Sequence, residues 1–413
     1  MAAGMPETIE TDVLDLDLEE TPSDPVSGWR VPLGLFFHGV PAMVAGVLLL
    51  AGLHGYVGYR LIGQTALGDR WSALGWSTLV GLGLSMPFGM ASARGERSSG
   101  AVALQWVAYL WTGTFGLLVV ALGLTDLGSW LYPLAPRTKA AGVTASVGSA
   151  VAWGVWRART LPTVTRIRIP ISSLGTAFHG FRILQLSDLH IGQTRGKREL
   201  EKVVQAVNRL KPDLVAITGD LAEGYVDCLR DELEPLSRLE ASCGIFFVTG
   251  NHEYYYGGGA WETELRQRGL TVLHNSHRLI TRGEAQLAIA GVTDLDGGEY
   301  EAGHHSDPAR ALRGIPAEVP RILLAHQPAT AQTLRDGGAS LRVDLQLSGH
   351  THGGQLWPFA PLVRIQQPVM HGLKRLWGTW VYTSRGTGYW GPPMRLGAPP
   401  EISEIMLESL PSA

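Results

Sequence analysis

The distribution of hydrophobic and polar residues divides the chain into two parts. No Asp, Glu, Lys or Arg occurs in residues 31–59, 71–93 or 98–125. Each of these runs is long enough to form a helix that crosses about 30 Å of hydrocarbon. A fourth run, residues 140–156, is shorter and rich in Ala, Gly, Ser and Val, so it is either a closely packed span or a buried hairpin partner. The pattern predicts an all-α transmembrane region of about four helices.

Beyond about residue 160 the hydrophobic runs are short, and Gly, Pro, Asp and His separate them. Six runs are predicted to be buried strands: residues 182–186, 214–218, 245–249, 287–292, 322–326 and 345–349. Between the first two, apolar residues recur at helical spacing from Leu200 to Leu210, which predicts a strand–helix–strand unit. We therefore expect an α/β domain built as a β-sandwich with a largely buried sheet and flanking helices.

Composition and charge narrow the classes of function. The chain is 45% hydrophobic, with a formal net charge of -3 at pH 7, so a general attraction to nucleic acid is not expected. Residues 1–29 are acidic without Lys or Arg, which predicts a disordered tail. Cys228 and Cys243 are predicted to be ordinary thiols. The basic residues that flank the predicted spans favour a cytoplasmic C-terminal domain.

Side chains that can bind metal ions follow the predicted strands, at the point where each strand ends. They are Asp188 and His190 after the first strand, Asp220 after the second, Asn251 and His252 after the third, His326 after a later one, and His350 and His352 after the last. Open α/β sheets place ligand sites at the carboxyl ends of their strands. These side chains are therefore expected to converge on one site.

The chemistry of this donor set restricts the ion. Imidazole nitrogens combined with carboxylate and amide oxygens are too rich in nitrogen for Ca²⁺, and the thiolates of a structural zinc site are missing. Mn²⁺, Fe or Zn²⁺ would suit the set. The donors outnumber the needs of one ion, which favours two ions bridged by a carboxylate, an arrangement that can hold a hydroxide for attack at phosphorus.

Each of these residues also has an ordinary structural explanation when it is taken alone. Asp188 could cap a helix, Asp220 could form a turn, and His326 could be a hydrogen-bonded core histidine. The recurrence of such residues at successive strand ends favours the shared site. His304 and His305 lie in a polar loop and are predicted to be solvated, and His274 has no metal-type partner nearby in the sequence.

The order of the motifs resembles that of the calcineurin-like metallophosphoesterases. The motifs are DLH (188–190), GD (219–220), GNHE (250–253), His-x-Pro (326–328) and GHTH (349–352). The flanking segments HEYYYGG, LSGHTHGGQLWPF and SRGTGYWGPPMRLG are similar to those of the bacterial membrane-associated phosphodiesterase branch. The resemblance implies a metallophosphoesterase domain in residues 178–413, which follows a linker and first strand (159–177), the transmembrane region (30–158) and the tail (1–29).

The resemblance also implies a role for each position. Asp188, His190 and His352 would hold one metal ion, Asn251, His326 and His350 would hold the other, and Asp220 would bridge both and take part in catalysis. His252 would act as general acid or stabilise the charged phosphorane. Glu253 would orient a neighbouring residue. Arg385 and Tyr254 are candidates for substrate binding, although Arg385 is equally compatible with a salt bridge.

The function implied is that of a membrane-anchored phosphodiesterase of the bacterial cell membrane, which hydrolyses a phosphoester by attack of a metal-bound hydroxide. The substrate would be lipid-linked or soluble, and no obligate protein partner is implied. A phosphomonoesterase or a pyrophosphatase of the same fold, a nuclease, and a transporter with an appended phosphoesterase are alternatives. A receptor or scaffold that binds a phosphorylated ligand without turnover is a rival of another class.

Overall fold

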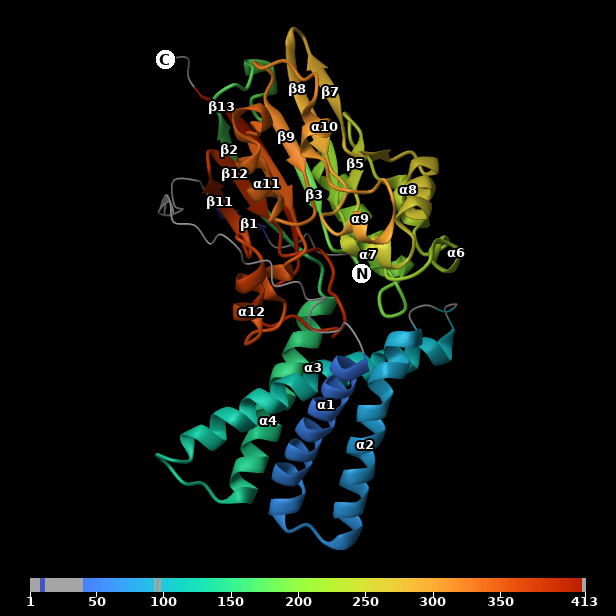
Figure 1. The fold of residues 1–413 in the computed structure, drawn as a ribbon, viewed down its shortest axis with the longest axis vertical. Coiled ribbons are helices and arrows are strands. Elements are labelled where there is room, and N and C mark those ends of the chain that lie inside the picture. Colours follow the sequence, from blue (N-terminus) through green and yellow to red (C-terminus); the bar gives the residue numbers. More distant parts are fainter. Residues whose placement is uncertain (1–7, 12–39, 93–94, 96–97, 411–413) are drawn as a thin grey trace.

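Four helices occupy the region that was predicted to be transmembrane. The computed structural model describes residues 8–11, 40–92, 95 and 98–410 (Figure 1). The helices are α1 (Val40–Leu61), α2 (Asp69–Ser92), α3 (Ser99–Gly128) and α4 (Pro136–Arg159). The start of the first predicted run lies outside the described residues, as does most of the predicted acidic tail. Within that tail, the short strand β1 (Thr8–Thr11) was not predicted.

Two segments of the described chain are long and apolar enough to cross a membrane. They are Pro41–Thr65, which contains α1, and Ser99–Gly128, which is α3. Helices α2 and α4 form but are not among these segments. In α4, Ala, Gly, Ser and Thr contribute little apolar surface per residue. By length and composition, the structure therefore supports two of the predicted spans.

Two mixed sheets form the rest of the molecule. The strands of the first sheet, in spatial order, are β1, β2 (Thr163–Ile171), β13 (Glu401–Ser409), β3 (Arg182–Leu186), β4 (Leu214–Thr218), β5 (Ile245–Val248) and β6 (Thr271–Val272). Those of the second are β11 (Gly372–Leu376), β12 (Thr379–Thr383), β10 (Leu345–Ser348), β9 (Arg321–Leu324), β8 (Ala285–Gly291) and β7 (Ser276–Arg282). Neighbouring strands β3, β4 and β5 are parallel, as are β8, β9, β10 and β12. The carboxyl ends of each parallel set therefore lie at one edge.

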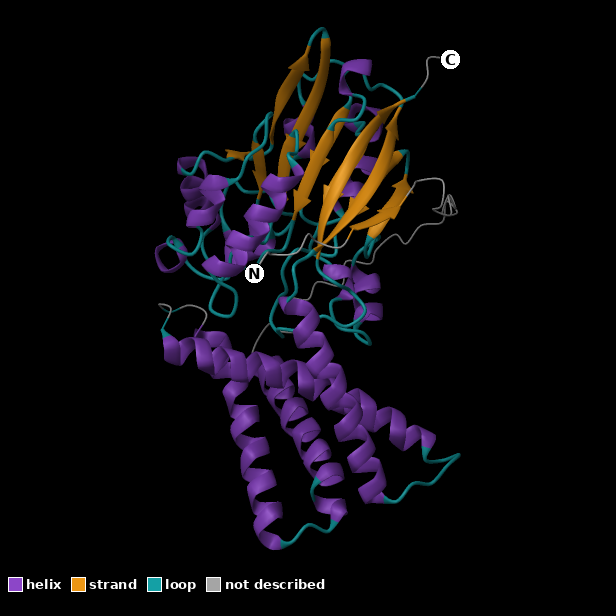
Figure 2. Ribbon diagram, turned by 180° about the vertical axis from the view of Figure 1, so that it is seen from behind, coloured by secondary structure: helices purple, strands orange, loops and turns teal. Residues whose placement is uncertain are grey.

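The two sheets pack face to face, and helices cover their outer faces (Figure 2). The core between the sheets includes Ile183 of β3, Ile322 of β9 and Leu345 of β10. Helix α5 (Lys197–Leu210) covers the first sheet, together with residues of α6 (Val226–Leu229) and α8 (Gly258–Gln267). Helices α10 (Pro308–Leu312) and α11 (Thr330–Asp336) cover the second. The short helices α7 (Asn251–Tyr255), α9 (Gly297–Tyr300) and α12 (Ala360–Gln366) complete this part.

The predicted sandwich with flanking helices is confirmed, and its central strands agree closely with the prediction. Strands β3 and β4 have the predicted bounds, because a strand that is buried on both faces shows an unbroken apolar run. Strands β6, β7, β11, β12 and β13 were not predicted. Strand β11, with the sequence GLKRL, illustrates the reason: it lies at a sheet edge and exposes charged residues that interrupt its apolar pattern.

One C-terminal loop joins the sandwich to the helices. Met394 of this loop is fully buried against α3 and α4. Glycines make room for it, since a Cβ on Gly113 of α3 would lie 2.9 Å from Met394 Sδ, and a Cβ on Gly154 of α4 would lie 3.0 Å from Met394 Cβ. Arg395 then donates its backbone N–H to the Gly154 carbonyl at 2.9 Å. In Figure 1, α12 lies beside the end of α4 at this junction.

Replacing Gly154 with Leu should lower the melting temperature of the full chain in detergent. The new side chain would be forced against Met394, and overpacking of this kind costs about 1–3 kcal/mol. Gly148→Leu in the same helix is the matched control, because nothing lies within 4 Å of a Cβ at that position and both changes gain the same helix propensity. Equal melting temperatures for the two variants, followed by circular dichroism, would contradict this packing.

Candidate metal centre

The side chains that follow the predicted strands converge at one edge of the sandwich. Asp188 and His190 follow β3, Asp220 follows β4, Asn251 and His252 begin α7 after β5, His326 follows β9, and His350 and His352 follow β10. All are buried except His350, which is half-buried. All except Asn251 fall into three overlapping groups of three, in each of which the candidate donor atoms lie within 4.8 Å of one another, and His190 and Asp220 with His252 form the group that links the two described next. The predicted convergence is therefore present.

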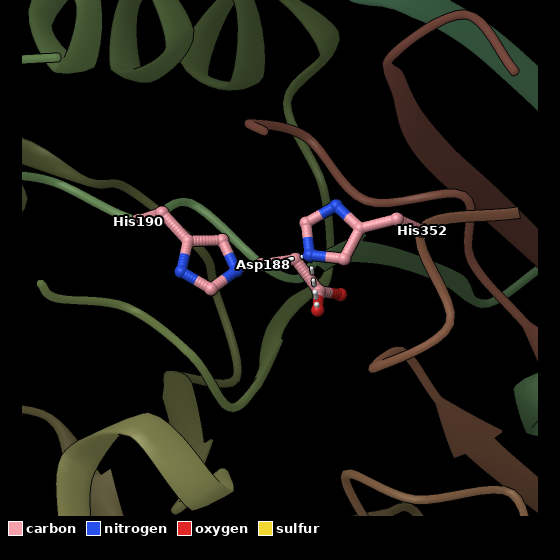
Figure 3. Close-up of side chains that lie close together, drawn as sticks. All are labelled: Asp188, His190 and His352. Atoms are coloured by element: carbon pink, nitrogen blue, oxygen red, sulfur yellow. Dashed lines mark hydrogen bonds and ion pairs between the residues drawn. The ribbon is translucent and has the colours of Figure 1, made fainter. Parts of the chain in front are cut away.

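The first group contains Asp188, His190 and His352 (Figure 3). His190 Nε2 and His352 Nε2 lie 3.0 Å apart, and His352 Nε2 lies 3.3 Å from Asp188 Oδ1. In Figure 3 the Asp188 carboxylate lies below the His352 ring, joined to it by a dashed line, and the His190 ring lies to the left of Asp188. The backbone N–H of His350 donates to Asp188 Oδ1 at 3.0 Å, which holds this carboxylate against the loop that carries both of the later histidines.

The second group contains Asp220, His326 and His350. His326 Nε2 lies 3.2 Å from Asp220 Oδ2 and 3.2 Å from His350 Nδ1. Asn251 Oδ1 lies 3.0 Å from the same His350 nitrogen, so the amide oxygen joins this group. Asp220 Oδ2 also lies 3.8 Å from His190 Nε2 in the first group. Asp220 is therefore placed between the two groups.

The backbone at this edge is held in a conformation that L-residues rarely adopt. Five of the candidate donors have positive φ: Asp188 (54°), His190 (46°), Asp220 (52°), His350 (69°) and His352 (51°). Such residues cost of order 1–3 kcal/mol each and cluster at functional sites. The left-handed turns direct these side chains from several strands to one point.

Glu223 is a residue of this site that the sequence analysis did not single out. Its Oε1 lies 2.5 Å from His190 Nδ1 and 2.6 Å from His252 Nδ1. One carboxylate thus holds both rings and leaves their Nε2 atoms on the side of Asp220, where His252 Nε2 lies 3.9 Å from Asp220 Oδ2. The sequence did contain a signal for Glu223, because an acidic residue three positions after Asp220 lies on the same loop as that candidate ligand.

The charges around His252 favour its protonated form. Burial lowers the pKa of this imidazole, but Glu223 and Asp220 outweigh burial and raise the pKa to about 9. Burial raises the pKa of Glu223, but His252 and His190 outweigh it and lower that pKa to about 2. The two charges favour an imidazolium beside a carboxylate, which is the state that a general acid requires.

Two further side chains hold the loops of the site together. Glu253 accepts backbone N–H bonds from Gly250 at 2.7 Å, Asp220 at 3.0 Å and Leu221 at 2.8 Å, so it fastens the loop after β4 to the start of α7. This geometry agrees with the orienting role expected for Glu253. Arg395, which the sequence analysis did not single out, performs the corresponding role on the other side of the site.

The Arg395 guanidinium is 1% exposed and is surrounded by backbone carbonyls. It donates to the carbonyls of His352 at 2.8 Å and Arg385 at 2.7 Å, and also to that of Gly388. Its Nη2 lies 3.1 Å from His352 Nδ1. Burial lowers the pKa of this guanidinium to about 9. Arg395 therefore fixes the position of His352 from the same loop that contacts the helices.

The two residues predicted to bind substrate both make polar contacts with other residues of the chain. Arg385 pairs with the buried Glu401, with its Nε 2.8 Å and its Nη2 2.5 Å from Glu401 Oε2. Tyr254 is buried, and its hydroxyl lies 3.0 Å from Thr249 Oγ1 and 3.1 Å from His304 Nδ1. A role for either residue in substrate binding stays a prediction.

Two partly exposed aromatic residues lie closer to the candidate acid. The ring of Tyr255 lies 4.9 Å from that of His252, and the Tyr255 hydroxyl accepts a hydrogen bond from Asn251 Nδ2 at 3.0 Å. The ring of Trp390 lies 5.9 Å from that of His252. Their exposed fractions are 41% and 52%. The surface beside His252 is therefore aromatic.

Comparison with known proteins decides the family. The family model described as calcineurin-like phosphoesterase matches residues 181–354. A metallophosphoesterase of Aquifex aeolicus (strain VF5) is 36% identical over 234 residues, covering 55% of this chain and 85% of that protein. Another, YkuE of Bacillus subtilis (strain 168), is 31% identical over 255 residues, covering 59% of this chain and 85% of that protein.

This chain belongs to the metallophosphoesterase family. The family predicted from the motif order is thereby confirmed. A further relative, the "Transmembrane protein with metallophosphoesterase domain" of Danio rerio, is 39% identical over 262 residues, which cover 62% of this metallophosphoesterase chain. The chain spans 60% of the length of that relative.

Metallophosphoesterases use two divalent metal ions, and the His and Asp groups described above are suitable for binding them. The chemistry of the donors tests this fit. Glu223 engages Nδ1 of His190, and Nε2 of that ring faces Nε2 of His352 at 3.0 Å. Arg395 Nη2 donates to His352 Nδ1, so in the neutral ring the proton lies on His352 Nε2 and bridges this contact. A divalent ion would replace that proton, and the mixture of imidazole nitrogens and carboxylate oxygens suits such an ion.

Replacing Glu223 with Gln should lower kcat about 10- to 100-fold, because a positioned general acid contributes about 10²–10⁴-fold to the rate. The variant should also lose activity at a lower pH than the wild type. Glu223 raises the pKa of His252, so without this carboxylate the imidazolium loses its proton earlier as the pH rises.

The measurement is the pH profile of kcat for hydrolysis of a nitrophenyl phosphoester, with Glu240→Gln as the matched control because Glu240 is exposed. If the alkaline limb of the Glu223→Gln profile stays at the wild-type pH, the pairing of Glu223 with His252 has no catalytic role.

Proposed function

We propose that this chain is a membrane-anchored, dinuclear metal-dependent phosphoesterase that acts on phosphodiesters. The observation that carries the proposal is the position of Asp220, whose carboxylate lies between two groups of buried histidines. A carboxylate shared by two sets of donors is the arrangement expected of a bridging ligand in a two-metal site.

The proposed ligands follow from the two groups. Asp188, His190 and His352 would hold one ion, Asn251, His326 and His350 would hold the other, and Asp220 would be shared by both. Mixed nitrogen and oxygen donors suit Mn²⁺, Fe or Zn²⁺. When bound, the two ions supply an activated water nucleophile and neutralise charge on the phosphate oxygens.

The chain's own residues supply the acid. His252, held by Glu223, donates a proton from Nε2 to the leaving oxygen, while the Nδ1 side of the ring remains fixed by the carboxylate. Glu253 and Arg395 hold the loops of Asp220 and His352, so that the donors do not need to reorganise during the reaction.

Two features favour a diester over a monoester. A monoester carries more negative charge, and Arg385, the candidate phosphate clamp, is committed to Glu401. A diester carries a second organic group, and the half-exposed rings of Tyr255 and Trp390 beside His252 suit such a group. Phosphomonoester hydrolysis is the alternative that cleavage of p-nitrophenyl phosphate would reveal.

The anchor brings this chemistry to a membrane surface. Helix α3 and the segment that contains α1 are able to span, and the loop that carries Trp390 also carries Met394, which packs against α3 and α4. This arrangement supports a lipid-linked substrate. We propose a cytoplasmic catalytic domain because of the basic residues that flank the helices, and a bacterial cell membrane because the flanking segments resemble those of the bacterial branch.

The test is hydrolysis of bis(p-nitrophenyl) phosphate and p-nitrophenyl phosphate by the full chain in detergent, stripped of metal and then reloaded with Mn²⁺ or Zn²⁺. The diester should be cleaved faster, and only after reloading. Asp220→Asn should lose activity together with the metal held by this centre. His252→Ala should keep its metal and lose activity at least about 100-fold, because it lacks the general acid.

His179→Ala is the matched control, because His179 is exposed and pairs with Ser409 in β13. Faster cleavage of the monoester would replace the diester assignment. A folded, metal-loaded protein that cleaves neither substrate, and that retains a bound phosphoester unchanged, would instead be a receptor or scaffold.

A further inference from the structure

A further cluster of side chains that could bind a metal ion lies outside the candidate metal centre. It consists of Glu262 in α8, His274 between β6 and β7, and His304 in the segment after α9, whose candidate donor atoms lie within 4.8 Å of one another. The sequence analysis predicted that His304 is solvated and found no metal-type partner for His274. The fold brings three separate segments together here.

The separations of the donor atoms suit a tetrahedral ion. Glu262 Oε1 lies 2.8 Å from His274 Nδ1 and 4.0 Å from His304 Nδ1. Zinc binds imidazole nitrogen and carboxylate oxygen at about 2.0–2.2 Å, which places two ligands of a tetrahedral site about 3.3 Å apart. The two observed distances lie on either side of this value, so small rotations of the side chains would complete the geometry.

The outer nitrogens of both rings are already engaged. His274 Nε2 lies 3.2 Å from the Gly303 carbonyl oxygen, and His304 Nε2 lies 3.4 Å from Glu301 Oε2. Both partners are acceptors, so they favour a proton on Nε2 and leave the lone pair of each neutral ring on Nδ1. In His304 this lone pair accepts a hydrogen bond from the Tyr254 hydroxyl at 3.1 Å, which a bound ion would replace. Metal-binding histidines are oriented in this way, by a carbonyl or a carboxylate on the opposite nitrogen.

A neighbouring arginine holds the Glu262 carboxylate. Glu262 Oε2 accepts a hydrogen bond from Arg266 Nη2 at 2.9 Å, which leaves Oε1 directed at His274. A neutral His274 would then place a lone pair 2.8 Å from a carboxylate oxygen, and this contact is repulsive unless a proton or a metal ion lies between the two atoms. The Glu262 side chain is 5% exposed, whereas those of His274 and His304 are 21% and 15% exposed, so an ion can enter from solvent.

We propose that Glu262, His274 and His304 form a third metal site, which binds Zn²⁺ with three protein ligands and an open fourth position. This inference goes beyond the proposed function and does not depend on it. The site would fasten α8 to the segment after α9. Tyr254, whose hydroxyl lies 3.1 Å from His304 Nδ1, belongs to α7 together with Asn251 and His252, so the ion would stabilise the helix that supports the candidate acid.

The test counts metal in the full chain in detergent after stripping, reloading with Zn²⁺ and removal of free ion, by inductively coupled plasma mass spectrometry. Glu262→Gln and His304→Gln should each bind one Zn²⁺ fewer per chain than the wild type. Zn²⁺ should raise the melting temperature of the wild type more than that of either variant. His277→Gln is the matched control, because its ring contacts the Ala311 carbonyl and lies outside the cluster.

The proposal is decided by the difference in bound Zn²⁺ per chain between the wild type and each variant. This difference does not depend on how many ions the catalytic centre holds. If both variants bind as much Zn²⁺ as the wild type, the cluster is an imidazolium–carboxylate pair and the proposal is overturned. If the variants do not fold, Co²⁺ in the wild type decides instead. A tetrahedral cobalt spectrum that persists in Asp220→Asn supports the third site, and its absence overturns it.

Discussion

The burial of many ionisable side chains at one edge of the sandwich is the constraint on which the rest of the structure depends. Imidazoles and carboxylates without compensation would be expensive to remove from water. Here Asp188 and Asp220 each contact histidines, Glu223 pairs with two rings, and Glu253 accepts three short backbone hydrogen bonds. The strained left-handed turns persist only because tightly packed strands enter each of them from the core. A rigid sandwich is therefore a physical requirement for a site of this kind.

The sequence predicted the centre of the molecule better than its periphery. Strands β3 and β4 are buried on both faces, so their hydrophobic runs are continuous, and the donors that follow them obey the rule that ligand sites lie at the carboxyl ends of strands. Edge strands such as β11 lack that signal. Glu223 lies 33 residues from His190 in the chain, and Arg395 lies 43 residues from His352. Contacts between such distant segments depend on loop conformations that periodicity does not encode.

The same limit applies to His274 and His304. Neither belongs to a recognisable motif: His274 lies among mixed neighbours, and His304 adjoins His305 in a polar loop. Their convergence on Glu262 follows from the path of the chain after β8, which returns across α8 and brings His274 and His304 within 4.6 Å of each other, measured between ring centroids. By contrast, the helical region was visible in the sequence as uncharged runs. The role of Gly113 and Gly154, which make room for Met394, could be seen only once the loop was placed against them.

The C-terminal loop that carries Met394 links the helices directly to the metal centre. Trp390 lies beside His252, Met394 is enclosed by α3 and α4, and Arg395 is bonded both to the backbone of α4 and to the carbonyl of His352. These residues lie within six positions of one another, too few for one end of the segment to move freely while the other stays fixed. A displacement of the sandwich from the helices would therefore strain the position of His352. The geometry of the metal centre and the packing of the sandwich against the helices therefore depend on the same short segment, residues 390–395.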